Sequence, residues 1–455
     1  MQLPPEEISF KTSLVFWKLY ETFLVYNNKE ASEVLANSEF EGNIHDGYHF
    51  ENFEGERMPL KWIATTGHLF LPICIELHKD EFACVEDPGI KGKIQIDAHI
   101  YPEGVIVLQA RLDFENYMRI GQLILASIPT SIVLTDGMNM KDKLDGFASK
   151  LIDILRAGIK RQKRILEEKA SPWHHNWILW KTKPETPISD FDVNGRYFKY
   201  ALGICTRSDK WQFLDPENYA NVIENVDNLS PYEGNCVYIT HPGNCIIPSK
   251  EFTDPKSIKN TLIDVVFATE VGNVQRYLIL NHLQDFNSKS LEIQEILYRY
   301  EEYEHGELKE ISLEELIDRL EKIEREVNEL VLEINSDLQI TRTPRLIFTS
   351  VFKTRLLRQM IRALHGFDFY ESLFKIVGEV KDSLSRERDA LGIKVSEAEN
   401  VFLRNLQIVF IIGLVAQMIT LFYAVERFSL DLGLMFVSLS VVLSALILIA
   451  LRRLA

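Results

Sequence analysis

One face of an uncharged apolar segment near the C-terminal end carries small and polar side chains at helical spacing. The segment covers residues 406–425. Its small and polar residues are Gly413, Ala416, Gln417, Thr420, Tyr423 and Ala424. Steps of three and one keep them on one side of a helix, and a glutamine amide among apolar side chains needs water or a polar partner. Rings of amides and hydroxyls around an axis can coordinate hydrated cations. We therefore expect Gly413, Gln417, Thr420 and Ala424 to line a pore.

The same face has a second interpretation as a contact between two membrane helices. Small residues let helix backbones approach closely, and polar residues join them by hydrogen bonds. The opposite face is wholly apolar, with Ile411, Leu414, Val415, Met418, Leu421 and Phe422. A pore wall and a packing face are both compatible with this pattern, so the two interpretations stay open.

A second uncharged apolar segment, residues 432–451, follows after a short turn. Each segment is long enough to cross a bilayer core of about 30 Å as a helix. Glu426 and Asp431 lie in the turn and are expected at the pore mouth, and Arg452 and Arg453 in the tail are expected to form a cytoplasmic basic ring. Because lysine and arginine mark the cytoplasmic flank, we expect a multi-pass protein of the inner or plasma membrane with both termini cytoplasmic.

Other residues whose side chains could take part in catalysis or metal binding do not form a catalytic pattern. His174 and His175 are adjacent, but neighbours on a strand point to opposite faces, so a core or surface role is expected. The five cysteines show no paired spacing and indicate reduced, mostly buried thiols. We find no phosphate-binding loop, nucleophile elbow or zinc-protease motif. The sequence thus does not predict an enzyme.

The net charge of −16 is unevenly distributed. Residues 291–340 hold 16 Asp and Glu against 5 Lys and Arg, whereas residues 341–365 hold six Lys and Arg and no acid. Adjacent blocks of opposite sign commonly mean two antiparallel helices with facing charges. Alternatively, the acidic helix senses a divalent cation and the basic helix lies near lipid headgroups. The overall acidity argues against nucleic acid as a partner.

The first 285 residues predict a mixed α/β body in two parts, 1–170 and 171–285. In the first part we expect strands at 68–78, 93–99 and 105–112 and helices at 114–127 and 140–168. In the second part we expect strands at 196–205, 236–240 and 245–247 and a helix at 257–270. The order strand, turn, strand, helix occurs twice, which indicates either a duplicated half or one mixed sheet.

Long helices follow. Residues 286–365 predict an acidic and basic helical hairpin, with a three-heptad apolar seam from Leu313 to Ile334. Pro344 marks a boundary, a helix is expected at 345–364, and Gly366 is expected to stop it. Asp368 is then the expected N-cap of a stalk helix at 366–405 that continues into 406–425. One helix from there to Ala424 is about 85 Å long and implies bundling with further copies of the chain.

This order of parts resembles the CorA family of pentameric divalent-cation channels. The resemblance covers the last 170 residues by architecture: an acidic helix and its partner, a long stalk helix, two spans and a basic tail. It implies an α+β fold with a cytoplasmic sensor domain, stalk helices and a C-terminal two-helix transmembrane hairpin. It also implies a homo-oligomer, most often a pentamer, that conducts or gates Mg²⁺ or another divalent cation. The family's Gly-Met-Asn at the end of the first span is replaced here by Tyr423, Ala424 and Val425, while Gly137, Met138 and Asn139 lie far away.

Two alternative functions fit the same order of parts. One is a ligand-gated membrane effector of the CRISPR-associated CorA-like type, whose cytosolic domain binds a nucleotide-type ligand and whose membrane part perturbs the bilayer. The large N-terminal region and the missing Gly-Met-Asn favour this alternative. The other is a membrane-anchored scaffold without transport. Membrane lipid and further copies of the chain are partners in all three hypotheses.

Overall fold

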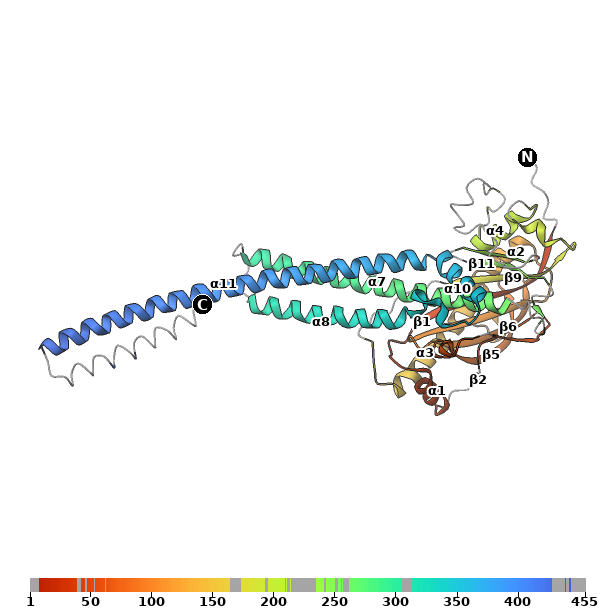
Figure 1. Cartoon of the computed structure of the whole chain (residues 1–455). Helices are drawn as coiled ribbons and strands as arrows, with labels where there is room; N and C mark the ends of the chain where they lie inside the picture. Colours follow the sequence, from red (N-terminus) through yellow and green to blue (C-terminus); the bar gives the residue numbers. More distant parts are fainter. Residues whose placement is uncertain are drawn as a thin grey trace. The chain divides into compact units, whose positions relative to one another are not determined.

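The computed structural model divides the chain into two compact units (Figure 1). The first unit comprises residues 1–285 and 330–376, and the second comprises 286–329 and 377–455. The structure describes residues 8–38, 42–45, 47–52, 54–61, 63–163, 173–192, 195–208, 210, 213, 235–240, 243–249, 253, 254, 256, 262–304, 313–427, 438 and 442.

One mixed sheet organises the first unit. In the described part of the chain its strand order is β10-β11-β9-β1-β7-β6-β5-β2, with β8 paired to β5. The strands are β1 Ser9–Glu21, β2 Asn43–His45, β5 Ile73–Cys84, β6 Lys91–Ile100, β7 Val105–Phe114, β8 Ile132–Leu134, β9 His174–Lys183, β10 Cys236–Ile239 and β11 Gly243–Ile247. A separate hairpin joins β3 His49–Glu51 and β4 Arg57–Pro59. Strands from both predicted α/β segments therefore join a single sheet.

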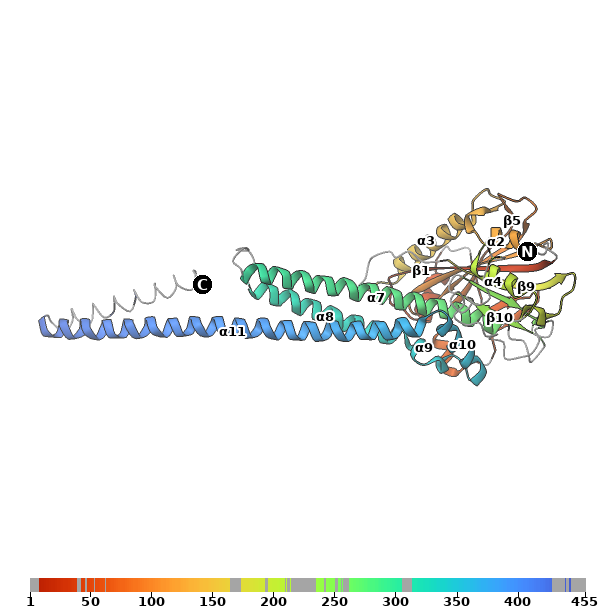
Figure 2. The same ribbon diagram turned by 90° about the horizontal axis from the view of Figure 1, so that it is seen from above.

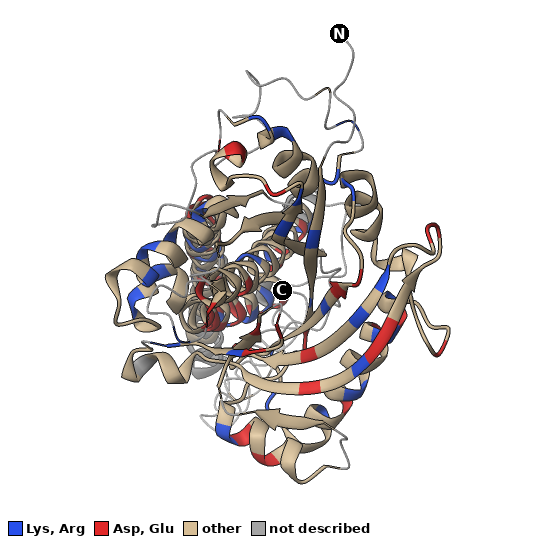
Figure 3. Ribbon diagram, turned by 90° about the vertical axis from the view of Figure 1, so that its right-hand side faces the viewer, with Lys and Arg blue, Asp and Glu red and all other residues tan. Residues whose placement is uncertain are grey.

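The sheet is antiparallel except at one pair. β1 lies between β7 and β9, with Ser13 opposite Asp113 on one side and Ile178 on the other. β11 runs parallel to β9, with Asn244 opposite Asn176. Acidic and basic residues are interspersed along the outer strands (Figure 3). This alternation fits strands with one solvated side rather than a surface of a single charge.

One face of the sheet is apolar and is covered by short helices. These are α1 Asn28–Ala36, α2 Ile120–Ala126, α3 Met140–Gly158 and α4 Phe198–Thr206. In α3, Met140, Leu144, Ala148, Leu151 and Leu155 follow helical spacing and are buried in the core. Burial of these side chains together with those of β6 and β7 supplies the main driving force for folding of this unit.

The remaining elements of the first unit are the beginning of a long helix and a group of short helices. α7 spans Leu262–Glu304 and starts in this unit. α9 Gln339–Arg342 and α10 Val351–Ala363 follow the end of α8 Leu313–Asp337. The 3-10 helices are η1 Thr65–Leu69, η2 Pro129–Ser131, η3 Ile188–Phe191 and η6 Pro344–Leu346.

The second unit consists of helices. The later part of α7, most of α8 and α11 Gly366–Arg427 contribute to it, and these helices lie side by side (Figure 2). The apolar seam predicted for α8 is buried from Leu316 through Val327. Lys289 of α7 contacts Glu326 at 2.6 Å, and Arg388 of α11 contacts Glu324 at 2.7 Å. α8 is thus held on both sides by its own unit.

Several predicted elements are confirmed, and others are wrong. The hairpin around Tyr101–Gly104, the strand pair β10–β11 and the single long helix that ends in the apolar segment are present. The predicted strand at 196–205 is instead helix α4, because its apolar residues pack at helical spacing on the sheet. Helix α3 ends at Gly158 rather than 168, and the predicted strand at 68–78 begins only at Ile73.

The region around Gly366 also differs from the prediction. α10 is shorter than expected, since η6 occupies residues 344–346 and Ser350 caps α10 by accepting from the Lys353 amide. The turn of the chain falls on His365, whose φ is +60°, and Gly366 opens α11 instead of ending α10. A β-carbon on Gly366 would lie 2.6 Å from the Ile361 side chain, so close packing explains this glycine. Asp368 lies in the first turn of α11 and is not its N-cap.

Within the described residues, no ion pair joins the acidic block to the basic block. Acids of α8 pair with Arg319 on the same helix, with Lys289 and Arg388, and, at Asp337, with Lys163 and His282. The exposed arginines of α10, Arg355, Arg358 and Arg362, form no ion pair within the described residues.

Candidate functional site

A buried carboxylate marks the polar face of the sheet. Glu270 of α7 is 0% exposed and accepts hydrogen bonds from four side chains of other elements. Tyr48 Oη and Trp17 Nε1 donate to Oε2 at 2.8 and 3.1 Å. Tyr101 Oη donates to Oε1 at 2.8 Å, and His99 Nδ1 lies 2.7 Å from the same oxygen. We call Glu270 and these four side chains the Glu270 cluster.

The electrostatics of the Glu270 cluster favour a fixed ion pair. Burial by itself lowers the pKa of His99, but the charge and hydrogen bond of Glu270 outweigh burial, and the pKa of His99 is raised. Burial and the Glu270 charge raise the pKa of Tyr48 and Tyr101 well above ordinary values. Both phenols therefore remain donors, and the carboxylate is satisfied on all sides. The cluster anchors α7 to the sheet rather than presenting a free acid or base.

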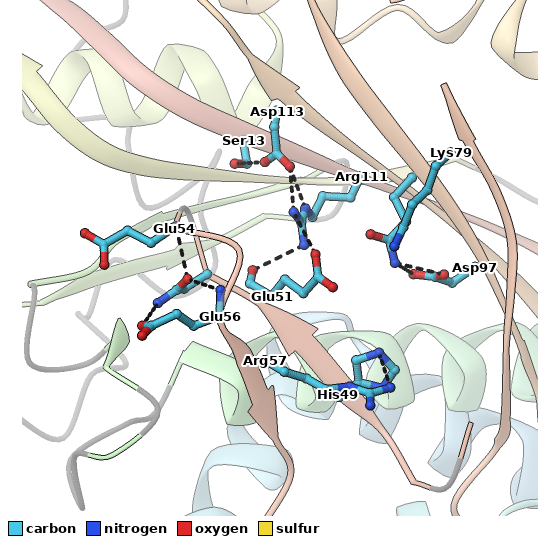
Figure 4. Close-up of polar contacts among 12 residues, drawn as sticks. Ser13, His49, Glu51, Glu54, Glu56, Arg57, Lys79, Asp97, Arg111 and Asp113 are labelled. Carbon is cyan, nitrogen blue, oxygen red and sulfur yellow. Dashed lines mark hydrogen bonds and ion pairs between the residues drawn. The ribbon is translucent and has the colours of Figure 1, made fainter. Parts of the chain in front are cut away.

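The rim of the polar face carries a second group of charges (Figure 4). The Arg111 guanidinium donates to Asp113 Oδ2 at 2.9 and 2.6 Å, and it lies 3.6 Å from Glu51. The Ser13 hydroxyl donates to the other oxygen of Asp113. Because two guanidinium nitrogens donate to one oxygen of Asp113 and a second carboxylate, Glu51, lies close, the charge of Arg111 is already balanced.

Asp97 lies beside this rim on β6. Gln95 Nε2 donates to its two oxygens at 3.1 and 3.0 Å (Figure 4). Burial raises the pKa of Asp97, and His99 and the Gln95 bond oppose that rise. On the neighbouring hairpin, Arg57 contacts the ring of His49, and burial followed by the Arg57 charge lowers the pKa of His49 to about 4. The rim therefore contains carboxyl and imidazole groups that can hold protons.

A small cavity adjoins the Glu270 cluster. The His174 ring lies 5.7 Å from the Trp17 ring, and His174 also lines the cavity. The cavity measures about 30 Å³, enough for one or two water molecules and far too small for a nucleotide. It is lined by Leu19, Trp173, His174, Asn273, Arg276, Tyr277 and Leu280.

The adjacent histidines His174 and His175 and the five cysteines are core residues. His174 and His175 are both buried; His174 lies against Trp17, and His175 Nε2 lies 3.2 Å from the carbonyl oxygen of Ile204 in α4. All five cysteines are buried thiols that form no disulfide. Among the residues that the structure describes, no group of three or more His, Cys, Asp or Glu side chains is placed to hold a metal ion.

The predicted pore face lies on the final part of α11. Gly413 and Gln417 are partly covered, whereas Ile411, Leu414 and Met418 on the opposite face are exposed. Thr420, Ala424 and Glu426 belong to the same helix, and their side chains lie outside the described part. The mouth residue Asp431, the tail residues Arg452 and Arg453, and residues 432–451 except Ser438 and Val442 also lie outside it.

The displaced Gly-Met-Asn has a local structural role. Gly137 adopts a φ of +83° in the turn after β8, a conformation that favours glycine. Asn139 is the N-cap of α3, and its Oδ1 accepts from the Asp142 amide at 2.9 Å. Turn and cap geometry therefore account for the tripeptide at this place.

The Glu270 cluster has no signature in the local sequence. Its members come from β1, the segment before β3, β6, the turn after β6 and α7, so no local spacing joins them. One available indication was a single glutamate inside the apolar run Val265–Val274. A charge at such a position requires buried partners.

Comparison with known proteins finds no matching family model, curated protein or solved structure.

Proposed function

We propose that this protein is a membrane-anchored homo-oligomer of CorA-like architecture that conducts or gates cations through its first span. The supporting observation is the composition and exposure of α11. Among the described residues it is the one helix long and apolar enough to cross a membrane, and none of its apolar window is buried inside the chain. Its first 40 residues are rich in charge, and no charged side chain occurs from Leu406 to Val425.

The exposed apolar surface requires a partner. Ile411 and Ile412 are 58% and 62% exposed, and Met418 is 70% exposed. Side chains of this kind around a helix are stable in lipid or against further helices, not in water. Residues 432–451, which the structure describes only at two positions, supply the second span of the proposed hairpin. Both termini then lie in the cytoplasm, and the assembly is a pentamer by resemblance.

Gln417 is the proposed selectivity or gating residue. It shares a face with Gly413, one turn before it, and Thr420, one turn after it. An amide at mid-membrane depth is stable where it meets water, and a ring of amides offers oxygen ligands to a hydrated divalent cation. Mg²⁺ is the cation that the resemblance implies.

The test compares Gln417→Leu with Met418→Leu, a change on the opposite, exposed face. Both purified variants are reconstituted in liposomes, and Mg²⁺ entry is followed with an internal dye while native mass spectrometry reports assembly. We expect Gln417→Leu to abolish flux with assembly intact, and Met418→Leu to retain flux. Unchanged flux through Gln417→Leu would refute the pore assignment.

The ligand-gated effector is the second candidate. Its supporting observation is the absence of Gly-Met-Asn after Phe422, together with an N-terminal body much larger than a minimal sensor. A nucleotide-type ligand would need a site larger than the described cavity of about 30 Å³. A thermal-shift comparison of Mg²⁺ with cyclic nucleotides on the full chain separates the two candidates, and a response to neither favours a scaffold without transport.

A further inference from the structure

Five segments of the first unit bring charged side chains together where α7 and α8 meet the sheet. Glu21 ends β1, Glu103 lies in the turn between β6 and β7, and Lys163 follows α3. His282 comes from α7 and Asp337 from the end of α8. We call these five residues the Lys163 cluster. Both helices continue from here into the second unit.

Lys163 connects three of these segments. Its Nζ donates to Asp337 Oδ2 at 3.1 Å and to the carbonyl oxygen of Glu103 at 2.5 Å, and it lies 3.3 Å from Glu21 Oε1. His282 Nε2 lies 3.3 Å from the same oxygen of Asp337. One ammonium therefore holds the β6–β7 turn and the end of α8 together.

The carboxyl groups outnumber the cation, and one of them has no hydrogen-bond partner. Glu103 is 6% exposed, and neither of its carboxyl oxygens forms a hydrogen bond within the described residues. Glu21 and Asp337 are also buried, and one oxygen of Glu333 is buried without a partner. A buried carboxyl group that accepts no hydrogen bond is far more stable neutral than charged.

The electrostatic surroundings also favour a raised pKa for Glu103. Burial raises the pKa of Glu103 to about 8; its own backbone N–H opposes this rise, the charge of Asp337 adds to it, and the charge of Lys163 opposes it. Burial also raises the pKa of Glu21, against the charge of Lys163. For Asp337 the charge of Lys163 and the bond to His282 outweigh burial, so its pKa is lowered. The charges of Asp337 and Lys163 act on Glu103, and Tyr26 lies near enough to be affected by Glu103, Glu21 and Lys163.

We propose that the Lys163 cluster is a proton-responsive joint between the sheet and the end of α8, in which Glu103 is the group that gains and loses the proton. With the proton bound, Glu103 is neutral and the β6–β7 turn remains packed beside the Lys163–Asp337 pair. When the proton leaves to water, a second negative charge appears next to Asp337, with Lys163 already shared. The turn and the end of α8 then separate or admit water. This inference does not depend on ion conduction.

The sign of the pH effect follows from the raised pKa of Glu103. An acid whose folded-state pKa lies above its ordinary value of 4.5 stabilises the fold at low pH, and that contribution is lost as pH rises to about 8. Local opening should therefore increase between neutral and mildly alkaline pH. We expect this increase in local opening at residues near 98–107 and 330–340.

Hydrogen-exchange mass spectrometry on the full chain in lipid nanodiscs tests the proposal. After correction for intrinsic rates, parent protein at pH 9 should show faster exchange in these two segments than at pH 6. Glu103→Gln, which mimics the neutral acid, should lose this difference. Glu115→Gln, at a glutamate that is 49% exposed and pairs with Lys91, should keep it.

Two outcomes would overturn the proposal. One is an unchanged pH response in Glu103→Gln; the other is a response confined to segments other than these two. If Glu103→Gln does not fold, infrared difference spectra of the parent between pH 6 and pH 9 take its place. If Glu103 is the proton-binding group, the parent should lose a protonated-carboxyl band between pH 6 and pH 9, and Glu103→Asp should shift that band. A band that Glu103→Asp leaves unchanged would refute the proposal.

Discussion

At the scale of single residues, Glu270 explains why a polar face can be buried under a helix. One carboxylate receives donors from Trp17, Tyr48, Tyr101 and His99, so charge and hydrogen-bonding capacity are matched. Such a network fixes α7 at one position along the sheet, because no other position satisfies all four donors. The same unit holds the Lys163 cluster, where donors are fewer than carboxyl oxygens. The first cluster is a fixed anchor, and the second is sensitive to protons.

Glu270→Gln should destabilise the first unit by about 3 kcal/mol, because it leaves His99 without its counter-charge in a buried site. Removing that charge should also lower the pKa of His99. Since a histidine with a raised pKa stabilises the fold below its unfolded value near 6.5 and less as pH rises through the folded value, the variant should lose most stability under acidic conditions.

Urea unfolding followed by tryptophan fluorescence at pH 6 and pH 8 measures this effect, with Glu115→Gln as the control. A loss in Glu270→Gln no larger than that of Glu115→Gln at either pH would contradict the anchoring role of Glu270.

At the scale of elements, α8 shows how a sequence repeat becomes a packed helix. The side chains at heptad spacing, including Leu316, Leu320 and Ile323, are buried, whereas Leu332 between seam positions is 69% exposed. The ion pair between Arg388 and Glu324 adds little, since both side chains are still partly exposed to water. Apolar contacts along the seam therefore hold the helices of the second unit together.

Leu320→Ala should cost about 2–5 kcal/mol of unfolding free energy, because it leaves a cavity where a 1% exposed side chain was packed. Leu332→Ala removes the same atoms from an exposed position on the same helix and should cost less than about 0.5 kcal/mol. Circular dichroism during urea unfolding compares the two. Equal losses would show that the seam is not the packing face.

Periodicity and turn residues predicted the elements that depend on local sequence. The α8 seam, the hairpin at Tyr101–Gly104 and the uninterrupted helix α11 belong to this group. The prediction of a strand at 196–205 was wrong, because a short apolar run is compatible with either a strand or a helix. Packing against the sheet favours the helix at this place. The Glu270 and Lys163 clusters were not predicted, since each joins side chains more than 100 residues apart in sequence.

At the scale of the whole molecule, α11 is the one helix among the described residues that is long and apolar enough to cross a membrane. α11 has 62 residues, which corresponds to about 93 Å of helix, and its final third is apolar on its exposed sides. An isolated helix of this kind is unstable in water, so we propose self-association and lipid as its partners. Conduction of cations, a pentamer and a cytoplasmic body follow from the resemblance and remain our proposal.

A cryo-EM map of the full chain in lipid nanodiscs tests that proposal most directly, because it reports the number of subunits and the surroundings of Gln417 together. We predict several copies around one axis, with the first spans innermost and the Gln417 amides facing a hydrated path. A single copy, or Gln417 held in a dry contact between two helices with no path along the axis, would contradict it.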